Sequence, residues 1–237
     1  MNIKMQCCGL VILFVIGCFF RQQKRVRIYT ERIFVWTYRM VAVCVSLDIL
    51  SLVAIDSMDR LPLMLVDVAC KLYNTSLVLV VMLGLLYAAV DAYPDEIYVK
   101  FLRGSIAAAA AEAVCIFLLP IEYVTDGAGE FLYTFGPSVY ATYISGLIFM
   151  VATVVVLVRR REYINSRRFE AVSLWLLCWL GSSLIQLCIK ELLLVGFGAT
   201  MGVLVLYVKL ENPETYIDRQ TGMFNSNALT YFLRERH

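Results

Sequence analysis

Apolar residues are grouped along this chain in blocks about twenty residues long, and short polar or charged stretches separate the blocks. A helix pairs its own backbone N–H and C=O groups, so an apolar block of this length is typical of a helix that crosses a lipid bilayer. The block boundaries predict seven spans, at residues 3–20, 33–55, 63–90, 104–121, 138–158, 170–190 and 192–209. The pattern therefore predicts an all-α fold, a polytopic membrane bundle of seven transmembrane helices.

The connections between the predicted spans differ in their content of basic residues. Those that follow the first, third, fifth and seventh spans contain Arg21, Lys24, Arg25, Arg27, Arg32, Lys100, Arg103, Arg159, Arg160, Arg161, Arg167, Arg168, Lys209, Arg219, Arg234 and Arg236. The opposite side has only Lys4, Arg60 and Lys190. Because basic loops remain in the cytoplasm, the charges predict an outside N-terminus and a cytoplasmic C-terminus.

Composition supports a membrane protein and argues against a metalloprotein. Hydrophobic residues make up 61% of the chain, whereas soluble domains are about half apolar. The eight cysteines all lie in apolar blocks, no CxxC motif occurs, and the one histidine is His237. We therefore expect no metal site and no cofactor. The lipid bilayer is the expected partner, and no nucleic-acid partner is expected.

Several polar side chains lie inside the predicted spans, where an ionisable group costs about 2.5–3.5 kcal/mol on insertion scales. Those in the outer half of the bundle are Asp48, Asp67, Lys71, Asn74, Gln186 and Lys190. This distribution predicts a polar site that opens to the outside and binds a small polar or zwitterionic ligand. An alternative is that an Asp67–Lys71 ion pair and a few hydrogen bonds only hold helices together. Glu112, in the fourth span, is the exception in this pattern and could equally be buried and protonated.

The longest outer connection, residues 122–137, reads EYVTDGAGEFLYTFGP. Gly127 and Gly129 make it flexible, which allows a lid over a bound ligand. Its aromatic residues also suit an ordinary loop at the membrane surface. Both interpretations stay open.

The residues after 209 leave the apolar pattern and contain the stretch DRQTGMFNSNAL, Asp218 to Leu229. This stretch resembles the opening signature of GGDEF domains, the diguanylate cyclase family, which reads D-x-L-T-G-L-x-N-R-x-x-F. The matching residues are Asp218, Thr221, Gly222 and Asn225. The residues that differ are Gln220, Met223, Ser226 and Leu229.

The resemblance implies a signalling protein of the bacterial inner (plasma) membrane. Residues 1–209 would be a seven-helix sensor domain, and residues 210–237 a cytoplasmic linker with the first residues of a GGDEF-like output domain. In that family the signature serves structure and signal transfer, and the catalytic residues come much later. The chain itself is therefore not expected to be an enzyme, whereas a longer parent would be a diguanylate cyclase that dimerises through its output domain.

Other membrane functions fit the same spans to different degrees. A retinal photoreceptor needs a lysine within its last span, and residues 192–208 contain none. A small seven-span transporter usually has helices broken near the middle of the membrane, but the five prolines here fall at span ends or in loops. The sequence thus favours a membrane sensor that controls cyclic di-GMP, with a small transporter or a stand-alone membrane binding protein as alternatives.

Overall fold

The computed structural model describes residues 3–22, 29–125, 131–189, 192–211 and 223. Lys190 and the residues that match the GGDEF signature, Asp218, Thr221, Gly222 and Asn225, lie outside the described residues. The predicted roles of these residues therefore stay predictions.

The described part of the chain forms seven α-helices and one two-stranded antiparallel hairpin. The helices are α1 (Lys4–Gln22), α2 (Tyr29–Asp56), α3 (Leu63–Ala89), α4 (Asp95–Leu118), α5 (Pro137–Arg159), α6 (Ser166–Cys188) and α7 (Val195–Leu206). The strands β1 (Glu122–Thr125) and β2 (Phe131–Phe135) lie between α4 and α5, and a π-helical turn, η1 (Tyr207–Glu211), continues α7. Among these residues, the prediction of an all-α fold with seven helices is confirmed.

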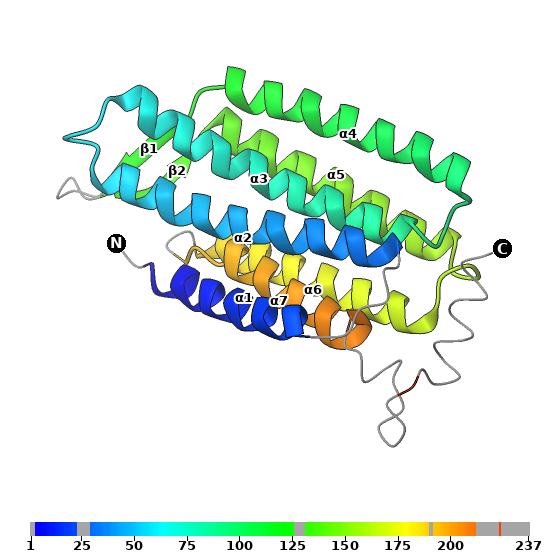
Figure 1. Cartoon of the computed structure of the whole chain (residues 1–237). Helices are drawn as coiled ribbons and strands as arrows, with labels where there is room; N and C mark the ends of the chain where they lie inside the picture. Colours follow the sequence, from blue (N-terminus) through cyan, green and yellow to red (C-terminus); the bar gives the residue numbers. More distant parts are fainter. Residues whose placement is uncertain (1–2, 23–28, 126–130, 190–191, 212–222, 224–237) are drawn as a thin grey trace.

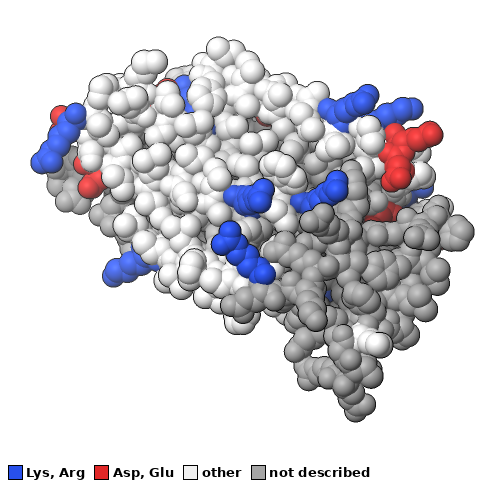
Figure 2. Space-filling model, viewed as in Figure 1, with Lys and Arg blue, Asp and Glu red and all other residues white. Residues whose placement is uncertain are grey.

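Length and composition identify most of these helices as membrane spans. Six of them, α1 to α6, are long and apolar enough to cross a bilayer, and the apolar stretch of the seventh is shorter, Val195–Leu210. Uncharged side chains cover a broad area of the face in Figure 2, and the charged ones gather mainly to either side of it. The chain is therefore a multi-span helical membrane protein.

The helices lie side by side, so that the bundle has two ends (Figure 1). The hairpin end holds β1, β2, the α2–α3 connection and the starts of α1 and α7. The arginine end holds the α5–α6 connection, with Arg159, Arg160 and Arg161, and the end of α7. Neither name assigns its end of the bundle to a side of the membrane.

Helix α3 is the central helix of the bundle. It packs against α2, α4 and α5, while α7 packs against α1, α2 and α6. In its most apolar stretch 72% of the α3 residues are buried, compared with 17% of those in α4. Most of the α4 surface is thus left to face lipid.

Glycines allow α7 to approach its neighbours closely. A methyl group on Gly202 would collide with the indole of Trp175, and one on Gly84 of α3 would collide with the other side of the same ring. A methyl group on Gly198 would lie 3.1 Å from the carbonyl oxygen of Cys178 in α6 and would collide with Ser182. Small residues at helix contacts let membrane helices pack by van der Waals contact, and here they fit α6 and α7 around one buried tryptophan.

Three features differ from the sequence prediction. Helix α4 begins at Asp95, nine residues before the predicted span, because Pro94 precedes it and two acidic residues occupy its first turn, where the helix dipole favours them. Residues 122–125 and 131–135 form a hairpin, not a loop. Helix α7 begins at Val195, not at 192, because the Gln186 side chain caps the helix there.

Candidate functional site

The predicted site residues divide between two faces of α3. Asp67 and Lys71 lie at the contact of α3 with α4, whereas Asp48 and Gln186 lie around the start of α7. We call the first group the Asp67–Lys71 pair. We call the second the Asp48 centre, defined as Gln6, Asp48, Tyr73 and the start of α7. The structure thus does not gather the predicted residues into a single site.

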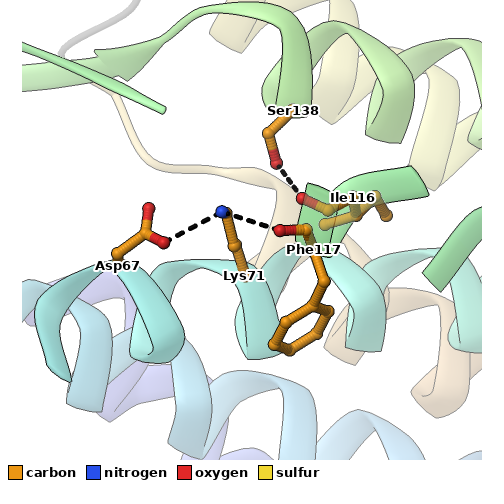
Figure 3. A network of polar contacts seen from close by, with 5 residues as sticks. All are labelled: Asp67, Lys71, Ile116, Phe117 and Ser138. Carbon is orange, nitrogen blue, oxygen red and sulfur yellow. Dashed lines mark hydrogen bonds and ion pairs between the residues drawn. The ribbon is translucent and has the colours of Figure 1, made fainter. Parts of the chain in front are cut away.

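The Asp67–Lys71 pair joins α3 to the end of α4. Lys71 Nζ lies 2.9 Å from Asp67 Oδ2 and donates to the Phe117 carbonyl oxygen at 3.0 Å (Figure 3). The neighbouring Ile116 carbonyl accepts a hydrogen bond of 3.0 Å from the Ser138 hydroxyl of α5. The last carbonyls of a helix have no partner within it, so these two side chains satisfy the end of α4. Their contacts support the structural interpretation of this pair.

The two other polar residues of the spans, Asn74 and Glu112, have different surroundings. Asn74 is buried on α3, three residues after Lys71. Glu112 accepts a hydrogen bond of 2.6 Å from the Ser145 hydroxyl, which joins α4 to α5. Glu112 is therefore partly buried and has a partner, which explains how the span tolerates it.

The Asp48 centre is more deeply buried and joins α1, α2 and α3. Asp48 and Gln6 each expose only 1% of their surface. Gln6 Nε2 donates to Asp48 Oδ2 at 3.1 Å and to the Leu193 carbonyl at 3.3 Å. The Tyr73 side chain lies near the Asp48 carboxylate.

Helix α7 starts directly against the Asp48 carboxylate. A methyl group on Gly196 would lie 3.1 Å from Asp48 Oδ2, so a larger residue here would crowd the carboxylate. The N-terminus of a helix carries a partial positive charge, which favours an anion at this position. The negative charge of Asp48 is thus placed where α7 attracts it.

Gln186 of α6 sets the position at which α7 begins. Its Oε1 accepts hydrogen bonds from the backbone N–H groups of Leu194, at 2.8 Å, and Val195, at 3.0 Å. The side chain of Tyr143 in α5 lies near Gln186. The first N–H groups of a helix have no partner within it, so this side chain serves as a cap. Side chains from α1, α2 and α6 thus meet the start of α7, and α3 and α5 contribute the tyrosines that lie near them.

Sequence reasoning found Asp48 and Gln186 but missed Gln6, Tyr73 and Tyr143. Gln6 could have been noticed, because it is a polar residue inside the predicted span 3–20. The two tyrosines gave no such signal, since tyrosine is common in membrane helices and at their ends. Their role depends on which helices pack together.

The arginine end has a different polar chemistry. Arg168 of α6 is 4% exposed, lies 2.8 Å from Asp91, and places its guanidinium 5.2 Å from the centre of the Tyr87 ring. The end of α7 is held by Tyr207, which packs against Phe20 of α1 and Phe34 of α2. The aromatic contacts of Tyr207 thus hold the exit of α7, and the Arg168–Asp91 pair joins α6 to the turn after α3.

The hairpin packs over the adjoining ends of α2 and α3. Tyr123 of β1 contacts the apolar cluster of Ala54, Ile55, Val66, Ala69 and Cys70. Its hydroxyl lies near the Cys70 side chain, and burial raises its pKa above the ordinary value for tyrosine. The hairpin base is therefore anchored to the bundle, and the prediction that the connection acts as a lid stays a prediction.

Comparisons with known proteins add no family to this description. No protein-family model matches the chain, and neither the curated proteins nor the solved structures contain a match. The class of the protein, a multi-span helical membrane protein, therefore stands on its own helices and their packing.

Proposed function

We propose that the chain is a membrane-integrated sensory module that relays a signal to a cytoplasmic GGDEF-type domain controlling cyclic di-GMP. One observation carries the proposal: α7 begins against the buried Asp48 centre and continues through η1 toward the residues that resemble the GGDEF signature. Helix α7 and η1 thus run from a buried polar group at the hairpin end to Glu211 at the arginine end, and the residues that resemble the signature follow later in the sequence. In this proposal the hairpin end faces outside and the tail is cytoplasmic.

The first step of the proposed mechanism is a change at the start of α7. The Asp48 centre and Gln186 hold this start through hydrogen bonds, not through apolar packing alone. A stimulus that alters those bonds changes how firmly the helix start is held. A stimulus shifts the equilibrium only if it favours one packing of α7 over the other.

The second step is a shift between two packings of α6 and α7. Their contact is formed by Gly198 and Gly202 against Ser182 and Trp175. We propose that the two packings differ in how α7 sits against this contact. Trp175 also touches Gly84 of α3, so movement of α7 would displace a side chain that contacts the central helix.

The third step occurs where α7 leaves the bundle. A π-helical turn, Tyr207–Glu211, follows α7 directly, and such turns are frequent at functional sites. Lys209 in this turn lies 3.1 Å from Glu170 of α6. We propose that a shift of α7 changes this exit and thereby the meeting of two output domains in a homodimer.

The size and activity of the native gene product test this function. An antibody to residues 122–137 would detect the native product, and conversion of GTP to cyclic di-GMP would be measured with it. We expect a product much longer than 237 residues, with cyclase activity that Gly202→Ala changes and the matched Gly181→Ala does not, because a methyl group on Gly181 meets nothing within 4 Å. A native product of 237 residues, or equal activity in both variants, would contradict the proposal.

The start of α7 also favours a second candidate, a small transporter. In many transporters a helix begins within the protein, and its positive end points to a bound substrate. Here α7 begins at Val195, whose N–H donates to the capping Gln186, and its first turn lies beside Asp48. Substrate uptake into liposomes that is retained after removal of residues 212–237 would favour this candidate over the sensor.

A further inference from the structure

The Asp48 centre has more buried acceptors than donors. Asp48 Oδ2 accepts from Gln6 Nε2, whose second hydrogen bond goes to the Leu193 carbonyl. The other amide atom, Gln6 Oε1, is buried and receives no hydrogen bond in the described part of the chain. Turning the amide over would not help, because Oε1 would then face the carboxylate and a carbonyl, which are both acceptors. One hydrogen-bond donor is missing beside Asp48.

Among the described residues, no counter-charge is placed at the same point. Within the described residues, Asp67 and Asp91 each pair with a cation, whereas no lysine or arginine pairs with Asp48. The ionisable groups that lie near the centre are Cys44 of α2 and Tyr73 of α3, and Tyr143 of α5 lies near Tyr73. None of these carries a positive charge, and the side chain that α1 places on Asp48 is the neutral amide of Gln6. An isolated buried carboxylate is costly, and such groups bind a proton instead.

We infer that the Asp48 centre is a proton-binding site in which Asp48 and Gln6 form a carboxyl–amide pair at the start of α7. A proton taken from water forms an O–H bond on Asp48, and that O–H donates to Gln6 Oε1. Gln6 Nε2 continues to donate to the carboxyl group at the distance of 3.1 Å already present. Two parallel hydrogen bonds then join the side chains, and the missing donor and the missing charge are supplied together.

The packing favours a proton over a larger cation. Asp48 and Gln6 are each 1% exposed, and Asp48 Oδ2 lies so close to α7 that a methyl group on Gly196 would sit 3.1 Å from it. A proton adds no volume to an existing oxygen, whereas a metal ion or an ammonium group must displace packed atoms. The positive end of α7 also opposes a second positive charge at this point.

Proton binding changes how α7 is held. Without the proton, the Asp48 charge is attracted to the start of α7, while Gln6 Oε1 stays unpaired. With the proton, the attraction weakens and the α1–α2 contact strengthens. That this change serves as the stimulus rests on the proposed function, whereas proton binding itself does not.

The intrinsic fluorescence of the chain can report the transition. Trp175 lies between Gly84 and Gly202, so a shift of α7 alters its surroundings. Trp36 is 62% exposed and can be replaced by phenylalanine, which leaves Trp175 and its neighbour Trp179. The Trp36→Phe chain in lipid nanodiscs would be titrated with acid and base. We expect a single-proton transition in the fluorescence.

Substitutions of Asp48 and Gln6, with one control substitution at Glu112, assign the transition to this centre. Asp48→Asn, which keeps the shape and cannot ionise, should abolish it. The matched control Glu112→Gln removes another carboxylate within a span, one that is bonded to Ser145 and distant from α7 in sequence and packing, and should leave it unchanged. Gln6→Met should lower the proton affinity about five- to tenfold, because the protonated state loses more hydrogen bonds than the ionised state.

Infrared spectroscopy keeps the test decisive even if a variant fails to fold. On the wild-type chain, a pH-jump difference spectrum should show the C=O stretch of a protonated carboxyl group appear with the fluorescence change. A transition that persists in Asp48→Asn, or no transition in the wild type, would overturn the inference. So would a transition at constant pH that follows added sodium chloride but not choline chloride, since it would assign the site to a metal cation. A native product that shows this transition but has no cyclase activity would contradict the proposed function and leave the proton-binding inference standing.

Discussion

Asp48 and Asp67 are both aspartates within the membrane bundle, yet their surroundings differ. Asp67 is 32% exposed and lies 2.9 Å from the Lys71 ammonium group, so its charge is balanced by a neighbour on the same helix. Asp48 is 1% exposed, and within the described residues its hydrogen-bond partner is the neutral amide of Gln6 in α1. The difference teaches that residues four apart can form an ion pair within one helix, whereas the Asp48 centre exists only because several helices pack together. The first is suited to hold helices, and the second to respond to a change.

Truncation of the two aspartates should break this comparison most strongly. Asp48→Ala leaves Gln6 without its carboxylate acceptor in the core, and we expect a loss of about 2–4 kcal/mol in the free energy of unfolding. Asp67→Ala should cost about 1 kcal/mol or less, because that side chain is partly exposed to begin with. Unfolding by SDS in mixed micelles, followed by circular dichroism, measures both. Equal losses would show that burial does not distinguish the two sites.

The glycine contact of α7 should show the next largest effect. Gly202→Ala pushes a methyl group into the Trp175 ring, and overpacking of this kind costs about 1–3 kcal/mol. Gly181→Ala on α6 is the matched control, since its methyl group meets nothing within 4 Å. We expect that variant to be neutral or slightly stabilising, because alanine has the higher helix propensity. The same SDS unfolding assay compares them, and a stable Gly202→Ala would contradict the close packing of α7.

The cap supplied by Gln186 should have an intermediate effect. Gln186→Met removes the acceptor for the Leu194 and Val195 N–H groups, and loss of a cap costs about 0.5–2 kcal/mol. Gln186→Glu retains the acceptor oxygens and should restore most of the stability. Hydrogen exchange at the first turn of α7 provides the local measurement, with faster exchange expected only in the methionine variant. Unchanged exchange there would mean that α7 begins without this cap.

The smallest effect is expected at the exit of α7. Lys209 and Glu170 are 43% and 58% exposed and lie 3.1 Å apart, so a double-mutant cycle should give a coupling of about 0–1 kcal/mol. The coupling should shrink further at high salt, because exposed pairs are screened. A coupling well above this range would place the exit of α7 among the strongly held parts of the molecule, with Asp91–Arg168.

Much of the architecture could be predicted from residue pattern, and the site only in part. The spans follow from apolar blocks, and the predicted limits of α2 and α5, 33–55 and 138–158, lie within the observed Tyr29–Asp56 and Pro137–Arg159. Lys71 and Asp67 could be paired from their four-residue spacing, which the 2.9 Å contact confirms. The start of α7 could not be predicted, because the cap at Val195 comes from a side chain nine residues away that folds back on it.

The sequence by itself determined that this chain is a bundle of membrane helices, because backbone groups in lipid must pair within their own segment and the bilayer sets the segment length. It also determined that Arg159, Arg160 and Arg161 follow the fifth span, in the connection that lies at the arginine end. Only the tertiary structure decided that Gln6 meets Asp48 across 42 residues, that Gln6 also reaches the Leu193 carbonyl, and that Asp48 lies beside Gly196. That decision depends on which helix faces pack together, and contacts between distant segments leave no periodic signal in a single sequence.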